Sequence, residues 1–139
     1  MTIVELEFDT TAAGRAPLGD IASSLVSVDE LLRDLATIAA YPSSAEYREI
    51  QVAAITMRNP LKVTLSLMAI PEEAVKAFQD ICREIILSRE RLRRGVIDAA
   101  LAACARQDIT AREAQRLHGH IATLQNAEVP LKAVVVKQE

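Results

Sequence analysis

Residues 59–73 have the sequence NPLKVTLSLMAIPEE, and this stretch decides the fold. From position 61 onward, apolar and polar side chains alternate, which is the period of a strand with one buried face. The apolar positions of this alternation are Leu61, Val63, Leu65, Leu67 and Ala69. The Asn-Pro pair predicts a tight turn before the strand, and the Pro-Glu-Glu run is typical of the first turn of a helix. The stretch therefore predicts a strand over 61–70 that leads directly into a helix.

Three further segments have strand patterns. Residues 2–8 alternate apolar with acidic side chains, and residues 130–137 form a short run rich in valine. Another strand begins near Tyr47, and its alternation changes parity at Ala53-Ala54. A β-bulge would absorb the extra residue, or the strand begins late. We therefore expect four strands in all.

The first helical region covers residues 17–40. Its apolar residues are spaced three and four apart, which predicts one amphipathic helix. Ser27 and Glu30 also match a capping box. The alternative is a short helix followed by a second helix from position 28, and we favour the single helix.

The second helical region begins at Pro71. Residues 71–107 are almost continuously helical in composition, with Gly95 as the natural break. Thr110 and Glu113 match another capping box, which predicts a further helix that ends near Gln125.

The resulting order is strand-helix-strand-strand-helix-strand. This order predicts an α+β, ferredoxin-like βαββαβ two-layer sandwich with a long helical insertion, an α-hairpin, in the second crossover. We expect the hairpin to project from the sheet. The 139 residues predict a single α+β domain, 1–139, with 89–125 as a helical extension of it.

Composition and charge narrow the class of function. The net charge is −3 and aromatic residues make up only 3%, so neither a basic field nor base-stacking platforms favour nucleic-acid binding. No apolar run approaches a membrane span, and no secretory signal is present at Met1. Cys82 and Cys104 both lie in helical pattern and are 22 residues apart, or roughly 33 Å along one straight helix, which favours reduced, buried thiols. We expect a cytoplasmic protein without a membrane partner.

No motif predicts catalysis or a bound cofactor. His118 and His120 are two positions apart on a predicted helix, so their side chains diverge and cannot share a metal ion. Glu72 and Glu73 are explained by the positive end of the helix dipole. The serines and cysteines lack a nucleophile motif, and the glycines are too scattered to cradle a phosphate. We expect no enzyme, no metal and no cofactor.

The densest charge cluster contains arginines that could bind phosphate groups. Its members are Arg83, Arg89, Arg91, Arg93 and Arg94. Glu84 and Glu90 interrupt the cluster, so we favour a solvated helix surface over a polyanion site.

The last strand is the most informative candidate for interaction. Val134, Val135 and Val136 place apolar side chains on both faces, and Pro130 is typical of an edge strand. A bare apolar edge invites aggregation, so we expect a cover: a second copy, a partner protein or another part of the chain. The predicted function is a non-enzymatic interaction or oligomerisation module. Nucleic-acid binding through Arg83–Arg94 and ligand sensing by fold analogy are the alternatives.

Overall fold

The computed structural model describes residues 1–10, 16–40, 49–88 and 90–138. It confirms the α+β class, with four helices and a four-stranded antiparallel sheet among these residues. In chain order the elements are β1 (Thr2–Phe8), α1 (Leu18–Ala40), β2 (Glu49–Thr56), β3 (Leu61–Met68), α2 (Glu72–Leu87), α3 (Arg94–Cys104), α4 (Ala111–Gln125) and β4 (Leu131–Gln138).

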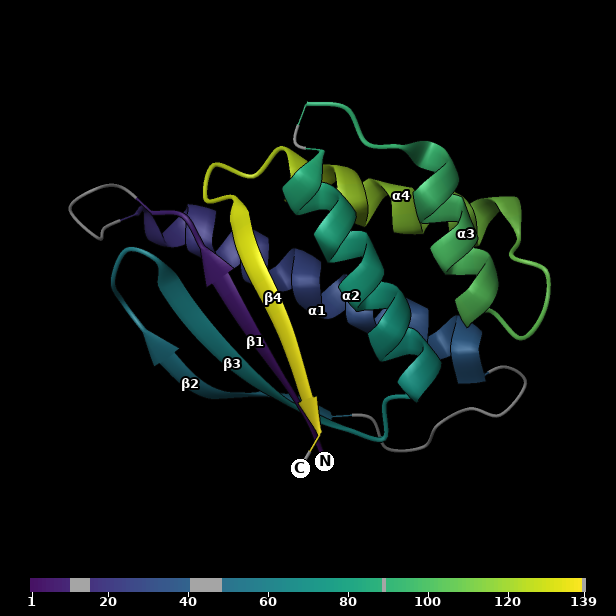
Figure 1. Cartoon of the computed structure of the whole chain (residues 1–139), viewed down its shortest axis with the longest axis horizontal. Helices are drawn as coiled ribbons and strands as arrows, with labels where there is room; N and C mark the ends of the chain where they lie inside the picture. The colour runs from purple at the N-terminus through teal and green to yellow at the C-terminus, as the bar shows by residue number, and fades with distance from the viewer. Residues whose placement is uncertain (11–15, 41–48, 89, 139) are drawn as a thin grey trace.

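The sheet has the strand order β2-β3-β1-β4 and is antiparallel throughout (Figure 1). The two central strands bury one face almost completely, and the buried side chains of this face are Val4, Leu6, Phe8, Leu61, Val63, Leu65 and Leu67. The alternation that predicted β1 and β3 is therefore confirmed. The opposite face carries acidic, hydroxyl and lysine side chains.

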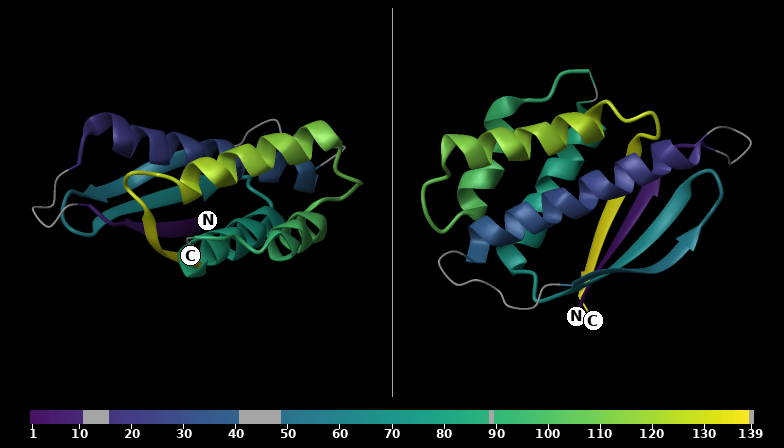
Figure 2. Two further views of the ribbon diagram at one scale, coloured as in Figure 1. Left: turned by 90° about the horizontal axis from the view of Figure 1, so that it is seen from above. Right: turned by 180° about the vertical axis from the view of Figure 1, so that it is seen from behind.

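Helix α1 lies across the buried face of the sheet, and α4 packs alongside it (Figure 2). We expected the second crossover to project as a hairpin, but α3 and α4 fold back and contribute to the same core. Their fully buried side chains are Ile97, Leu117, Ile121 and Leu124. Helix α2 contacts both α1 and β4 and closes the core at that edge.

Helix α1 is a single helix, as favoured from the sequence. The Ser27 side chain is buried within it instead of capping a second helix. The capping box of α4 is confirmed: the Thr110 hydroxyl accepts from the Glu113 N–H, and the Thr110 N–H donates to the Glu113 carboxylate, both at 3.1 Å.

The prediction for residues 71–107 places the break between the two helices at the wrong residue. Helix α2 ends at Leu87 and α3 begins at Arg94, so Gly95 lies in the first turn of α3 and not at the break. The Glu84 carboxylate explains the difference. It accepts a hydrogen bond from the backbone N–H of Arg93 at 3.1 Å, which ties the start of α3 to the last turn of α2.

Strand β2 contains the predicted bulge. Val52 is opposite Leu65 and Ala54 is opposite Thr64, so Ala53 is the extra residue. The bulge reverses the parity of the strand: Val52 before it and Ile55 after it both face the side of the sheet that the helices occupy.

Candidate functional site

Strand β2 is the open edge of the sheet. It pairs with β3 on one side, and the strand order places no described residue as a strand on its other side. In Figure 1 it lies at the margin of the molecule, on the opposite side from α2, α3 and α4. Its outer backbone N–H and C=O groups are therefore available to another strand.

The apolar side chains of this edge are exposed although they point toward the helix layer. Val52 is 57% exposed and Ile55 is 49% exposed, whereas their partners on β3 are buried. Met57, which follows the strand, is 52% exposed. The helix layer therefore covers the centre of the sheet and stops short of β2.

Apart from the bulge at Ala53, the edge lacks the devices that usually keep an edge strand from pairing. Proteins commonly protect edges with lysine, proline, β-bulges or inward-pointing charge. The strand sequence, EIQVAAIT, has Glu49 as its single charged residue. Unprotected backbone and exposed apolar side chains together make the β2 edge the candidate interaction surface, which we define as residues 49–58.

Strand β4, which the sequence predicted as an edge strand, differs from β2 in how its valine side chains are covered. Val134 and Val136 are opposite Leu6 and Val4 on the buried side and are half-buried. Val135 points to the other face and is 45% exposed. Helix α2 packs against β4, which supports the alternative that another part of the chain covers this edge.

The arginine cluster is divided by the structure, and Arg89 lies outside the described residues. Arg93 binds the buried Glu84 carboxylate through Nε at 3.0 Å and Nη2 at 2.7 Å. Arg94 forms a long ion pair of 3.9 Å with Asp98, and Arg91 is exposed. Arg93 therefore holds two helices together, and the other described members of the cluster, Arg83, Arg91 and Arg94, lie on the surface.

Glu84 is the described carboxylate with the strongest electrostatic perturbation. Its side chain is only 2% exposed. Hydrogen bonds from the Arg93 side chain lower the pKa of this carboxyl to about 2, against the opposing effect of burial. A carboxylate held this firmly in its charged form is suited to structure and unsuited to proton transfer near neutral pH.

The two histidines face different helices, as their spacing predicted. His118 Nε2 lies 3.0 Å from Asp98 on α3. His120 Nε2 lies 3.0 Å from Asp34 on α1, and its Nδ1 lies 3.2 Å from Glu30. The described residues contain no group of three or more metal-ligating side chains that could hold an ion.

The cysteines are both free and buried. Burial raises the pKa of the Cys82 thiol far above neutrality. Burial, with a smaller contribution from Glu73, raises the pKa of Cys104 to about 11. Both side chains are therefore thiols at neutral pH and poor nucleophiles.

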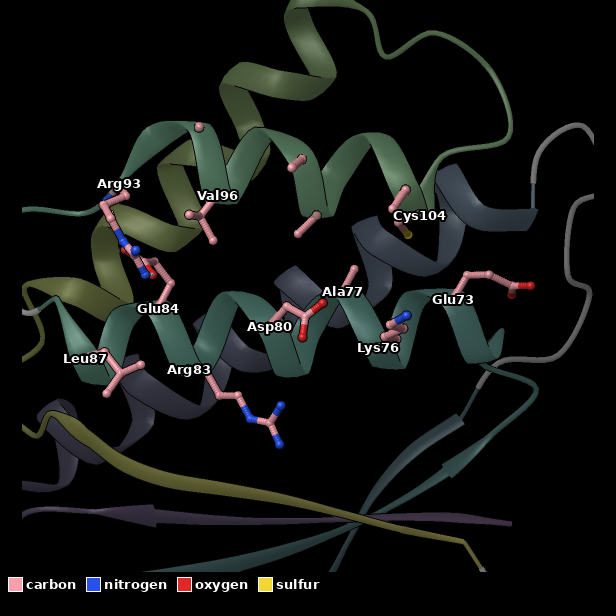
Figure 3. A pocket seen from close by; sticks show the side chains of 14 residues that line it. Glu73, Lys76, Ala77, Asp80, Arg83, Glu84, Leu87, Arg93, Val96 and Cys104 are labelled. Carbon is pink, nitrogen blue, oxygen red and sulfur yellow. Dashed lines mark hydrogen bonds and ion pairs between the residues drawn. The ribbon is translucent and has the colours of Figure 1, made fainter.

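An open groove of about 680 Å³ lies between α2 and α3 (Figure 3). Its floor is formed by small apolar side chains such as Ala77 and Val96. The charged residues at its rim alternate in sign along α2, and they are Glu73, Lys76, Asp80 and Arg83. The most buried charged group in the groove, Glu84, is already bound to Arg93, and the charged side chains from Glu73 to Arg83 lie at the rim.

The membrane prediction can be compared with the helices directly. Among the described parts of the chain, no helix is long and apolar enough to span a bilayer.

Sequence reasoning missed the β2 edge because it could not see which strand the helices leave uncovered. The parity change at Ala53-Ala54 was the available signal, since bulges concentrate at sheet edges. Comparison with family models, curated proteins and solved structures found no match for this chain.

Proposed function

We propose that the protein is a non-enzymatic interaction module that binds a partner by adding a strand to the β2 edge. The observation that carries the proposal is the exposure of Val52 and Ile55 on an unprotected edge strand. In this recognition mode, main-chain hydrogen bonds supply affinity and alternate side chains supply specificity. The module works in the cytoplasm, where the reduced thiols of Cys82 and Cys104 are stable.

The chemistry-bearing side chains support a non-catalytic role. Glu84 is held by Arg93, both histidines face carboxylates across helix contacts, and both cysteines are protonated in the interior. Each of these groups has a structural partner or a buried site. Glu84 and Cys104 both line the groove between α2 and α3, but there Glu84 is bound to Arg93 and Cys104 is a protonated thiol.

We infer that the scaffold is the ferredoxin-like arrangement, extended by α3 and α4. Two features support this assignment. The connection that contains α1 joins β1 to β2 with β3 between them, and the connection that contains α2 joins β3 to β4 with β1 between them. The assignment makes β2 and β4 the two edges, of which α2 flanks only β4.

The proposal is tested by paired capture from a lysate of the source cells. The wild type, Val52→Lys and Val135→Lys are immobilised, and the retained proteins are identified by mass spectrometry and then tested as purified components. Val135 is the matched control because it is also an exposed valine on an edge strand. A partner, the chain itself included, should be retained by the wild type and Val135→Lys and lost with Val52→Lys. Equal retention by all three proteins contradicts the proposal.

A further inference from the structure

We propose that the partner at the β2 edge is a second copy of this chain, paired antiparallel to β2 about a two-fold axis. The inference rests on the proposed function and names its partner. It follows from the bulge, the side-chain order and the charges of residues 49–58.

The bulge determines which self-pairings are possible. Opposed residues on antiparallel strands point to the same face of the sheet. A regular strand can therefore pair with itself only when the two opposed residues both have even numbers or both have odd numbers. In β2 the extra residue Ala53 reverses parity halfway along the strand. Positions before the bulge therefore match positions of opposite parity after it.

One register satisfies this condition with its centre between Ala53 and Ala54. Val52 is then opposite Ile55 of the second copy, and both belong to the helix-side face. Ile50 is opposite Met57 on the same face. On the other face, Gln51 is opposite Thr56. The apolar side chains are thus matched with each other, and the polar ones are matched with each other.

The same register brings opposite charges together. It places Glu49 opposite Arg58 of the second copy, and by symmetry this happens twice. Glu49 lies on the face away from the helices, where the Gln51 amide donates to its carboxylate, and Arg58 follows the end of the strand. Arg58 is exposed. The centre of the interface holds only alanine side chains, which let the strands approach closely.

Two-fold pairing also explains how an unprotected edge is tolerated. The same surface patch is buried on both copies, so the assembly is closed and cannot grow into a fibre. The product is a continuous sheet of eight strands, twice the four of one copy. Its outer edges are the two β4 strands, each with its own α2 alongside.

The mass of the wild type in solution tests the identity of the partner. Light scattering should give twice the chain mass of 15.2 kDa at micromolar concentration. Val52→Lys should raise the dissociation constant at least about tenfold, whereas Val135→Lys should leave it unchanged. Circular dichroism checks that both variants are folded. A monomeric wild type overturns the inference, as does a dimer that dissociates with Val135→Lys and persists with Val52→Lys.

Charge reversal tests the register. Glu49→Arg and Arg58→Glu alone should each weaken the dimer by about tenfold, because each creates two like-charge contacts per dimer. The double variant should restore the wild-type constant. Failure of the double variant to recover overturns this register.

Cysteine pairs give a second, independent test of the register. Directly opposed residues lie within disulfide reach, so a mixture of Val52→Cys and Ile55→Cys chains should cross-link under mild oxidation. Val52→Cys alone should not, because the two equivalent positions are about 10 Å apart along the strands. Cys82 and Cys104 are buried and do not compete. Cross-linking of Val52→Cys alone, or none in the mixture, contradicts the register.

These outcomes separate the two proposals. A monomer whose Val52→Lys variant loses a different purified partner contradicts self-pairing and supports the interaction module. A monomer that binds no partner through β2 contradicts both.

Discussion

Glu84 shows how a single residue decides the path of the chain. Its carboxylate is buried, and it accepts hydrogen bonds from the backbone and side chain of Arg93. The identities of the two residues were visible in the sequence, but their pairing was not, because it depends on the chain reversing direction after Leu87. The same pairing removes Arg93 from the arginine cluster as a polyanion ligand.

We predict that Glu84→Gln lowers the free energy of unfolding by about 1.5–3 kcal/mol at pH 7, the range for hydrogen bonds to charged groups. The pKa of Glu84 is lowered to about 2 in the folded state, from an ordinary value of 4.5. The folded state therefore favours the charged carboxylate. The stabilisation is fully present above about pH 4.5 and is lost as the pH falls toward 2.

Urea unfolding at pH 7, 4 and 3 measures this effect. The difference between the wild type and Glu84→Gln should be largest at pH 7 and should shrink steadily at the two lower values. The control is the double variant Arg91→Ala with Arg94→Ala, which changes exposed side chains and should cost less than about 1 kcal/mol. A difference between the wild type and Glu84→Gln that stays constant with pH would show that the carboxylate charge is not responsible.

At the scale of the elements, sequence patterns predicted those features that depend on interactions between nearby residues. The alternation in β1 and the capping box of α4 were predicted, and the bulge at Ala53 was one of two alternatives for the parity change, because each depends on residues close together in the sequence. The end of α2 and the return of α4 onto α1 were missed, because they depend on contacts between distant segments. The exposure of β2 depends on where the helices stop, which no local pattern encodes.

We predict that Thr110→Ala lowers the free energy of unfolding by about 1 kcal/mol, because it leaves the N–H of Glu113 without its capping oxygen. The matched control is Thr123→Ala in the interior of the same helix. There the hydroxyl donates to the Gly119 carbonyl, which is already a helix acceptor, and alanine is the better helix former. Thermal unfolding should show a lower midpoint for Thr110→Ala only. Equal effects of the two variants would mean that the cap is not the cause.

At the scale of the whole molecule, the proposed dimer would couple stability to assembly. A folded dimer that unfolds to two chains is stabilised by its own concentration. We predict that the unfolding midpoint of the wild type rises with protein concentration, and that each tenfold increase is worth about 1.4 kcal/mol. Differential scanning calorimetry over two decades of concentration measures this rise.

Val52→Lys should weaken this concentration dependence, and Val135→Lys should retain it. Both variants place a lysine on an edge strand at an exposed position, so a general effect of added charge would change them alike. A wild-type midpoint that does not move with concentration would contradict a dimer whose dissociation accompanies unfolding.

The single extra residue in β2 has a consequence for how the protein can change over evolutionary time. Removing the codon for Ala53 would make the strand regular and would leave Val52 and Ile55 on the same face of the sheet. Two such strands would still match when paired about Ala54, with Val52 opposite Ile55 and Gln51 opposite Thr56. The proposed assembly would therefore tolerate an in-frame deletion of three nucleotides at this codon.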